Sequence, residues 1–253
     1  MKAFPMNRSE AKVESSSISV RPCTTVGEWR DCVALQAAVW RYNQDELVPV
    51  HVFAVAAKTG GQVLGAFEGE VQIGFALAFA AFAEHRRYLH SHMVAVLPEF
   101  QNRSVGRQLK LAQREDAIGR GIDLIQWTFD PLEIRNAYFN IARLGVVIRR
   151  YLIDVYGTSS SPLHRSLPTD RLLAEWWLKS SRVGAALENN SKAPSPTAEH
   201  ILVPDLSLEP DNAAVIQADV RQEFLRWFNQ DYAVTGFTVA QPSGVYLLEP
   251  YEN

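Results

Sequence analysis

The stretch from Val94 to Gly121 constrains the fold of this chain more than any other part of the sequence. It begins as an apolar strand that runs into Pro98, continues as a polar turn over residues 101–106, and then becomes a helix. A helix that starts directly after such a turn presents unpaired backbone N–H groups at the positive end of its dipole. This arrangement binds phosphate groups, although plain strand-to-helix connections use the same kind of turn. The stretch therefore predicts a strand, a turn and a helix, with a phosphate site as one interpretation of the turn.

The helix after the turn, which we expect to extend to about Arg120, has an apolar side and a basic side. We expect the basic side chains to lie in solvent, where they either meet phosphates or form an ordinary solvated face. The one nearest the turn is the best phosphate candidate. The apolar side carries Leu109, Ala112 and Ala117, and the basic side carries Arg107, Lys110 and Arg114.

Composition bounds the class of protein. A chain of 253 residues with 47% hydrophobic side chains can bury a core without disulfide support. A net charge of −3 and a pI near 6.1 argue against nucleic acid as a partner. Cys23 and Cys32 suit reduced, core-filling thiols, and the longest apolar run, Ile73 to Ala83, is too short to span a bilayer. With no signal-peptide pattern at the N-terminus, we expect a soluble, cytoplasmic protein that does not bind membranes.

The order of the expected elements predicts an α/β protein with a mixed sheet. Thr25 and Glu28 have the spacing of a capping box at the start of the first helix. The expected strands cover Ile18–Arg21, Val63–Phe67, Val71–Phe82, Tyr88–Val96, Asp123–Phe129 and Val146–Val155, and shorter helices cover His51–Lys58 and Ile134–Leu144.

The C-terminal part predicts an α+β extension of the same sheet in preference to an independent domain. A polar tail at residues 1–17, a core at residues 18–157 and the extension at residues 158–253 make up the expected organisation. The extension contains expected strands over Arg171–Leu178, Tyr232–Val239 and Val245–Leu248, a helix over Asp219–Phe228 and a polar loop over Leu187–His200.

The residues Gln101-x-x-Ser104-x-Gly106 resemble motif A of the GNAT acetyltransferase superfamily, whose usual form is Gln/Arg-x-x-Gly-x-Gly/Ala. In that family the turn cradles the pyrophosphate of acetyl-coenzyme A. Ser104 replaces the first glycine, and serine carries a steric cost if the backbone there needs a positive φ. The order of elements over Ile18 to Gly157 is also that of the GNAT fold, which implies a mixed, mostly antiparallel sheet flanked by helices.

The resemblance implies a site for acetyl-coenzyme A or another acyl-coenzyme A. In the family, the strand before motif A splays from its neighbour, and its free backbone groups pair with the pantetheine arm. The expected cofactor-binding residues are Val94, Ala95, Val96, Gln101, Asn102, Arg103, Ser104, Val105, Gly106, Arg107 and Asn136.

Counted back from Gln101, His90 falls where histone-acetylating members of the family carry a catalytic glutamate. Histidine suits proton removal near neutral pH, because its ordinary pKa is about 6.5. His90 and His92 are expected to share one face of the strand, with Ser91 and Met93 on the other. His92 is the second candidate, as the base or a residue that orients it, and the alternative is that both histidines only bond to neighbours. No third ligand for zinc is recognisable nearby, so we expect no metal.

A general acid is harder to assign. Many family members carry a tyrosine in the helix after the fifth strand, and Ile141 occupies that position here. Tyr138 lies one turn earlier and is the candidate, with Tyr151 on the next strand as another. Both suit packing equally well, and a thiolate can also leave without a protein acid.

Three residues are candidates for contact with the acceptor: Trp40, Trp127 and Asp130. Each aromatic side chain suits a core position as well as a binding surface. Asp130 has two interpretations, as a cap of the following helix or as an anion that attracts an amine.

The leading functional hypothesis is an acyl-coenzyme A-dependent N-acyltransferase, most simply an N-acetyltransferase, in which an amine attacks the thioester directly. The alternative is an acyl-coenzyme A-binding sensor, or a GNAT-like module that has lost catalysis. A third hypothesis is transfer to a hydroxyl or from a carrier-protein thioester. The expected partner is a small-molecule or peptide amine, and a homodimer is left open.

Overall fold

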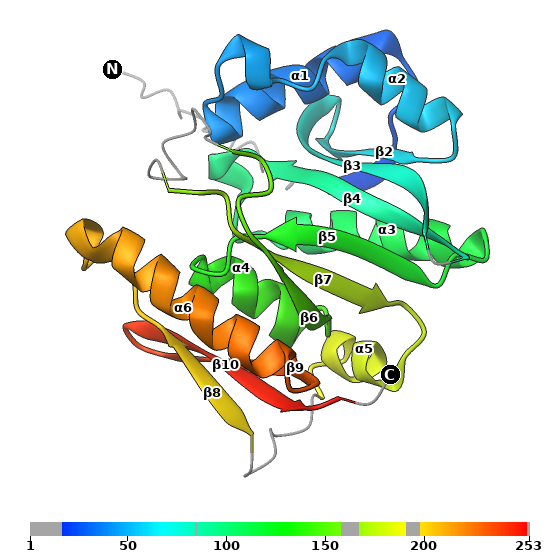
Figure 1. Ribbon diagram of the computed structural model, residues 1–253. Coiled ribbons are helices and arrows are strands. Elements are labelled where there is room, and N and C mark those ends of the chain that lie inside the picture. The colour runs from blue at the N-terminus through cyan, green and yellow to red at the C-terminus, as the bar shows by residue number, and fades with distance from the viewer. Residues whose placement is uncertain (1–16, 84, 158–166, 191–197, 252–253) are drawn as a thin grey trace, which may run out of the picture.

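The computed structural model describes residues 17–83, 85–157, 167–190 and 198–251 (Figure 1). The predicted polar tail lies outside these residues except for its last position, and half of the predicted polar loop, residues 191–197, lies outside them as well. No helix within the described ranges is long and apolar enough to cross a membrane.

The described strands form one ten-stranded sheet in the order β1-β2-β3-β4-β5-β7-β6-β9-β10-β8. Every pairing is antiparallel except the one between β4 and β5. The mixed, mostly antiparallel sheet predicted from the sequence is therefore confirmed. The strands are β1 Ile18–Pro22, β2 Gln62–Glu68, β3 Val71–Ala83, β4 Arg86–Val96, β5 Leu124–Phe129, β6 Val147–Leu152, β7 Arg171–Trp177, β8 Glu199–Val203, β9 Tyr232–Ala240 and β10 Ser243–Pro250.

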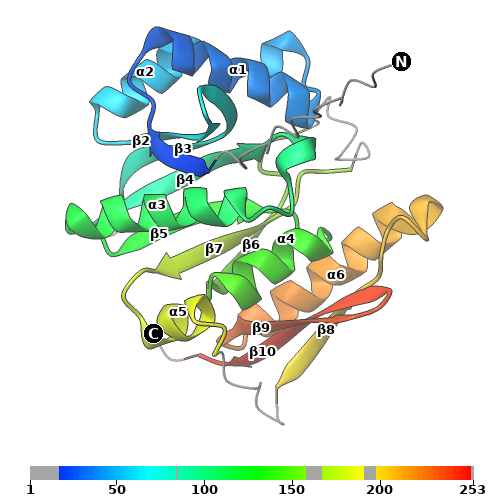
Figure 2. The ribbon, with the colours of Figure 1, turned by 180° about the vertical axis from the view of Figure 1, so that it is seen from behind.

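The helices cover both faces of this sheet. Figure 1 shows α1 and α2 gathered at one end of the molecule and α6 at the other, and Figure 2 shows the sheet from behind, with α3 along it. The α-helices are α1 Val26–Trp40, α2 Val50–Lys58, α3 Val105–Gly119, α4 Ile134–Tyr138, α5 Ser181–Leu187 and α6 Ala213–Phe228, and α4 continues as a π-helical turn, Phe139–Arg143.

Alternating residues of β3 show which helices cover which face. Phe75 and Leu77 pack in the cluster that contains buried residues of α1 and α2. Ala76, between them, packs instead with Val105 and Leu109 of α3. Because successive side chains of a strand point to opposite faces, α1 and α2 lie on one face of β3 and α3 on the other. We call these the α1/α2 face and the α3 face.

The N-terminal elements follow their sequence signals closely. Thr25 accepts a hydrogen bond from the Glu28 amide, and the Glu28 carboxylate accepts one from the Thr25 amide, so the predicted capping box is present. Cys23 and Cys32 are free and buried in the core, as predicted. The pKa of the Cys23 thiol is raised by its hydrogen bond with Cys32 and by burial, so this thiol stays protonated.

The C-terminal elements differ from the prediction in two places. β7 lies between β5 and β6, so residues of the predicted extension complete the central part of the sheet. Two short elements flank the predicted polar loop: α5, which Ser180 caps through the Val183 amide, and β8, which pairs with β10 at the sheet edge. Elements of five to seven residues are too short to show a periodic hydrophobic pattern.

Candidate functional site

The two parallel strands at the centre of the sheet separate after a short contact. β4 pairs with β5 only at Leu89↔Ile125 and His90↔Gln126. Its other edge stays paired with β3 as far as Val96. From Ser91 to Val96, β4 therefore has a backbone edge without a strand partner in the described chain. Unpaired backbone N–H and C=O groups need partners, so this edge suits an extended ligand that adds to the sheet like a strand.

A β-bulge sits at the closed end of this opening. Leu77 pairs with Met93 and Ala78 pairs with Ser91, so His92 is the extra residue on β4. The bulge reverses the alternation of faces beyond it. Ser91 faces α3, whereas Met93 packs on the α1/α2 face. The expectation that Ser91 and Met93 share a face is wrong, because a uniform period of two takes no account of an inserted residue.

The two histidines lie together, as predicted. Their ring centroids are 6.3 Å apart, and the His92 ring lies 5.5 Å from Phe79, which pairs with His90 and packs on the α1/α2 face. Burial, together with the charges of His92 and Lys110, lowers the pKa of His90 to about 4. Burial also lowers the pKa of His92. The His90 imidazole is therefore neutral at pH 7 and has a lone pair for a proton, although it is a weaker base than a free histidine.

The turn between β4 and α3 has the backbone that its sequence implied. Asn102 and Ser104 have φ values of 61° and 62°, in the left-handed region. Ser104 therefore bears the steric cost expected where the family motif has glycine. The Gln101 side chain donates a hydrogen bond to the Val96 carbonyl at 3.0 Å, which ties the turn to the end of β4.

In the first turn of α3, the position of Gly106 faces open space. Ser104 precedes the helix, but its hydroxyl makes no capping hydrogen bond. The amides of Val105, Gly106 and Arg107 begin the helix, where backbone N–H groups have no intrahelical acceptor. A Cβ added at Gly106 would have no atom within 4 Å. This end of α3 therefore has the polarity and the room to accept an anion.

The basic residues of α3 do not form the solvated face expected from the sequence. Arg107 donates to the carbonyl of Leu187 at 2.9 Å, at the end of α5. Arg114 donates to the carbonyl of Leu178 at 3.0 and 2.8 Å, just after β7. These carbonyls lie at the end of α5 and just after β7. The two guanidinium groups therefore bind backbone carbonyls at the ends of these elements and are not free to bind phosphates. Of the basic groups near the turn, Arg103 remains exposed, in an ion pair with Glu68 at 2.8 Å.

Lys110 is buried between α3 and the sheet. Its Nζ donates to the Ser91 Oγ at 2.8 Å and lies 3.6 Å from the centroid of the Trp127 ring. The Gln113 Oε1 accepts a hydrogen bond from the Ser91 hydroxyl at 3.0 Å. Burial lowers the pKa of Lys110 to about 7. The helical period could have indicated that Lys110 is buried, because the residue lies next to Leu109 and one turn before Gln113 on the buried side of α3.

Two of the three expected acceptor contacts have structural roles instead. Trp127 is 6% exposed and packs edge-on against Trp176 at 5.9 Å, so it belongs to the core on the α3 face. Asp130 accepts a hydrogen bond from the Leu132 amide at 2.8 Å and closes the turn after β5. It lies 4.0 Å from Arg171 and does not cap α4, which begins at Ile134.

Trp40, the third expected contact, stays on the α1/α2 face. It is half-buried at the end of α1, where it stacks on Tyr42 at 5.8 Å. Burial raises the pKa of Tyr42, and the charges of Arg171 and Tyr156 also act on it. The segment after α1 therefore lies within electrostatic range of Tyr156 and of Arg171 at the start of β7.

The residues expected on α4 are solvent-facing. Tyr138 is 41% exposed, and no hydrogen bond or ring contact joins it to β4 among the described residues. Asn136 accepts a hydrogen bond from Asn140 at 3.1 Å, one turn along the helix. Ile141, at the position of the family tyrosine, is 2% exposed in the core.

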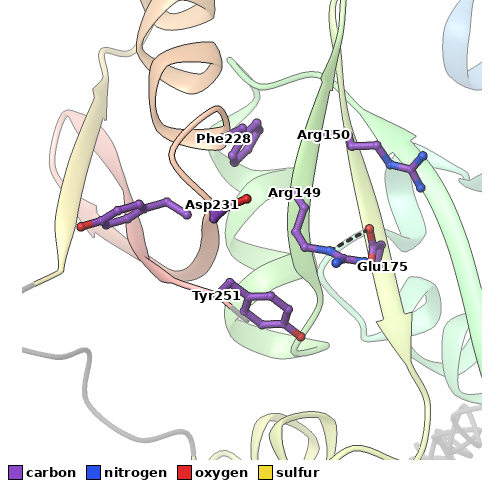
Figure 3. Close-up of a pocket in the computed structure, with 7 residues that line it drawn as sticks. Arg149, Arg150, Glu175, Phe228, Asp231 and Tyr251 are labelled. Atoms are coloured by element: carbon purple, nitrogen blue, oxygen red, sulfur yellow. Dashed lines mark hydrogen bonds and ion pairs between the residues drawn. The ribbon is translucent and has the colours of Figure 1, made fainter. Parts of the chain in front are cut away.

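A polar cavity of about 420 Å³ opens on β6 and β7 (Figure 3). Gln126 pairs with both His90 and Glu175, so these three residues form one row across β4, β5 and β7. Glu175 is 1% exposed and forms an ion pair with Arg149 at 2.8 Å, drawn as a dashed line in Figure 3. Glu175, on the wall of the cavity, thus lies two strand spacings, about 10 Å, from His90. Its lining consists of Arg149, Arg150, Glu175, Phe228, Asp231, Tyr232 and Tyr251.

Comparison with protein families identifies the part of the chain that contains β4, the turn and α3. Residues 28–139 match the family described as Acetyltransferase (GNAT) family. Over these residues the chain is similar to GNAT acetyltransferases. Comparison with curated proteins gave no match.

Solved structures show the same fold at low sequence identity. The ribosomal-protein-S18-alanine N-acetyltransferase from Escherichia coli has a TM-score of 0.52 and 12% identity, over 65% of this chain and 96% of that one. FeeM, an N-acyl amino acid synthase from uncultured soil microbes, has a TM-score of 0.52 and 12% identity, over 67% and 97%. NAA60 from Arabidopsis thaliana, solved with a bisubstrate analogue, has a TM-score of 0.50 and 11% identity, over 64% and 98%. The match to nearly the whole of each smaller protein leaves about a third of this chain as an addition to the GNAT fold.

Proposed function

We propose that this protein is an acyl-coenzyme A-dependent N-acyltransferase, most simply an N-acetyltransferase, that acts in the cytoplasm. The observation that carries the proposal is the opening between β4 and β5, which leads from the open first turn of α3 to a pair of histidines. The similarity of residues 28–139 to GNAT acetyltransferases supports the same reaction class. The E. coli neighbour is an alanine N-acetyltransferase and FeeM is an N-acyl amino acid synthase, which favours an amine acceptor.

The residues of the opening suit an acyl-coenzyme A. Its phosphates would bind the amides of Val105, Gly106 and Arg107, and its pantetheine arm would pair with the free edge of β4 along Val94 to Val96. When bound, it supplies an acyl group activated as a thioester. Because Arg107 contacts α5, we assign phosphate binding to backbone amides and to Arg103 in preference to the Arg107 side chain.

The α1/α2 face would receive the acceptor amine. His90 is the proposed base, and His92 is its neighbour at the bulge. The amine nitrogen bonds to the acyl carbon, the C–S bond breaks with its electron pair on sulfur, and His90 takes the proton released from nitrogen. The lowered pKa of His90 keeps the imidazole unprotonated down to about pH 4 to 5.

The cavity in Figure 3 is the proposed site for the far end of the acceptor. It lies on the row of side chains that begins at His90, and it offers both arginine and carboxylate groups. Arg150 is exposed, so an Arg150→Ala change removes charge from the cavity without opening the core. We expect it to raise the KM for the acceptor and to leave the KM for the acyl donor unchanged.

A binding module without catalysis is the second candidate function. Two observations favour it: Ser104 bears a positive φ where the family motif has glycine, and buried Ile141 stands at the position of the family tyrosine. Such a module would bind acyl-coenzyme A and release no thiol.

Thermal shift and thiol release together separate the two candidates. Acetyl-coenzyme A should raise the Tm in both cases, because a ligand that binds only the folded state stabilises it. Release of free coenzyme A with a panel of amines should occur only for an enzyme. His90→Ala should reduce this release by at least about tenfold, whereas the control His200→Ala, an exposed change on β8 at the sheet edge, should have no effect.

The outcomes bear on different parts of the proposal. No thermal shift with any acyl-coenzyme A would refute both candidates. A thermal shift without thiol release would favour the binding module. Undiminished turnover in His90→Ala would remove that histidine from the mechanism and leave the acyl-donor site standing.

A further inference from the structure

Lys110 is a buried cation that the proposed reaction has not yet used. The residue is 4% exposed, and its Nζ contacts the Ser91 hydroxyl and the face of Trp127. No ion pair joins it to a carboxylate among the described residues. Burying an ammonium group without a counter-ion costs stability, so a lysine at this position calls for a physical reason.

The position of its partner on β4 suggests that reason. β4 stops pairing with β5 at His90, and Ser91 is the next residue, so Ser91 lies at the closed end of the opening. The open turn of α3 lies beyond the other end, after Val96. The two ends are five residues of strand apart, about 16 Å at ~3.3 Å per residue.

The order of groups in an acyl-coenzyme A then fixes which end meets Ser91. Its phosphates and its thioester are at opposite ends of the pantetheine arm. With the phosphates at the turn and the arm along β4, the arm's far end reaches the closed end of the opening. This step rests on the proposed function.

We propose that Ser91 and Lys110 together supply the proton that the coenzyme A sulfur takes up when the C–S bond breaks. Ser91 is the catalytic residue: its hydroxyl hydrogen, which the Gln113 Oε1 accepts at 3.0 Å in the free protein, would turn from Gln113 to the sulfur when the acyl donor is bound. Lys110 is the positioning residue, which replaces the proton on the Ser91 Oγ through their 2.8 Å hydrogen bond.

The proton balance of this step is complete. The sulfur gains the electron pair of the C–S bond and the hydroxyl proton of Ser91. The Ser91 oxygen regains a proton from the Lys110 ammonium, which becomes a neutral amine and is reprotonated from solvent after product release. With its pKa lowered to about 7, Lys110 is a stronger acid than a thiol of ordinary pKa near ~8.5, so the transfer is downhill.

The groups around Lys110 leave its charge adjustable. Its Nζ contacts Ser91 of β4 and the Trp127 ring of β5, and Gln113 of its own helix bonds to Ser91; none of these groups is charged. The titratable group that interacts with it is His90, on the other face of β4, whose pKa it lowers. A carboxylate partner would hold the ammonium charged, whereas this environment lets it release a proton near neutral pH.

The decisive measurement is the titration of Lys110 by NMR, with [ε-¹³C]lysine in the full chain and Lys110→Met to assign its signal. Titrations are run on the free protein, with coenzyme A, and with S-ethyl coenzyme A, whose sulfur cannot ionise. Coenzyme A should raise the pKa of Lys110 above its value with S-ethyl coenzyme A, because a thiolate beside Ser91 stabilises the ammonium. Equal pKa values in the two complexes would overturn the proposal.

Variant kinetics provide the second readout. Ser91→Ala and Lys110→Met should each lower kcat by at least about tenfold, with a KM for the acyl donor within about threefold of the parent. Ser91→Thr, which keeps the hydroxyl, should recover most of kcat. A loss of Tm without a loss of kcat in Ser91→Ala would show a purely structural role and overturn the proposal.

The failure of this inference can be told from the failure of the proposed function. If coenzyme A and S-ethyl coenzyme A both fail to raise the Tm, the acyl-donor site itself is refuted and this inference falls with it. If both bind and the Lys110 titration is the same in each, only the Ser91–Lys110 assignment falls.

Discussion

At the scale of single residues, Lys110 shows how burial changes the meaning of a charged side chain. Lys110 is buried against the sheet next to Leu109, although a charged side chain is expected to lie in solvent. Ser104 shows the opposite case, because the motif alone indicated its positive φ. Backbone requirements of a motif can be predicted from sequence, whereas the depth of a lysine depends on which strand its helix crosses.

Replacing Lys110 with an apolar side chain of similar length should stabilise the protein. The folded state resists protonation of Lys110, since its pKa is lowered from 10.5 to about 7. Stability is therefore lost as the pH falls from about 10.5 towards 7, by at most about 5 kcal/mol. Lys110→Met removes this loss. The free energy of unfolding of the variant should therefore exceed that of the parent by an amount that grows as the pH falls from about 10.5 to 7 and stays constant below about pH 7.

Urea unfolding of parent and variant at pH 6, 8 and 10 measures this dependence. Lys179→Met, at an exposed lysine just after β7, is the control for the loss of a lysine side chain and should change the stability little. A gain that is the same at all three pH values would contradict a lowered pKa at Lys110.

At the scale of elements, α3 connects the site to the added C-terminal part. Its basic residues bond to carbonyls after β7 and at the end of α5. The sequence predicted α3 and its turn well, because a strong apolar period and a turn motif coincide there. It did not predict α5, whose seven residues give no period, or the bulge at His92, which only the register of β3 reveals.

Arg107 and Arg103 should separate structural from ligand contacts. Arg107→Ala removes a charged donor to the Leu187 carbonyl, so it should lower the free energy of unfolding by about 1.5 to 3 kcal/mol. Its effect on coenzyme A affinity should be under about threefold. Arg103→Ala, in an exposed ion pair, should cost at most about 1 kcal/mol and weaken coenzyme A binding more than Arg107→Ala does.

Urea unfolding and isothermal titration calorimetry on the same two variants give both quantities. If Arg107→Ala instead weakens coenzyme A binding more than Arg103→Ala does and leaves the stability unchanged, Arg107 binds phosphate, as predicted from the sequence.

At the scale of the whole molecule, the position of β7 joins the two predicted parts into one sheet. β7 covers the edge of β5 and contributes Trp176, which is fully buried against Trp127. The fold class could be predicted from the order of elements. The position of β7 between β5 and β6 could not be predicted, because a strand inserted between two earlier ones leaves no local sequence signal.

A chain that ends at Gly157 should not fold cooperatively. It would lack β7 and expose the edge of β5 together with the apolar side chains that β7 covers. Near-UV circular dichroism and urea unfolding should show no cooperative transition, while a chain that ends at Tyr251 should unfold like the full sequence. Cooperative unfolding of the shorter chain would show that residues 18–157 are a domain on their own.

Neighbouring residues of β4 point to opposite faces, with His90 towards α1 and α2 and Ser91 towards α3. In the proposed reaction His90 accepts a proton from the amine, and Ser91 donates a proton to the sulfur. The group that accepts the amine proton and the group that protonates the sulfur therefore lie on opposite faces of β4. Each group exchanges protons through its own face of the sheet, and one turnover releases a proton on the α1/α2 face while it takes one up on the α3 face.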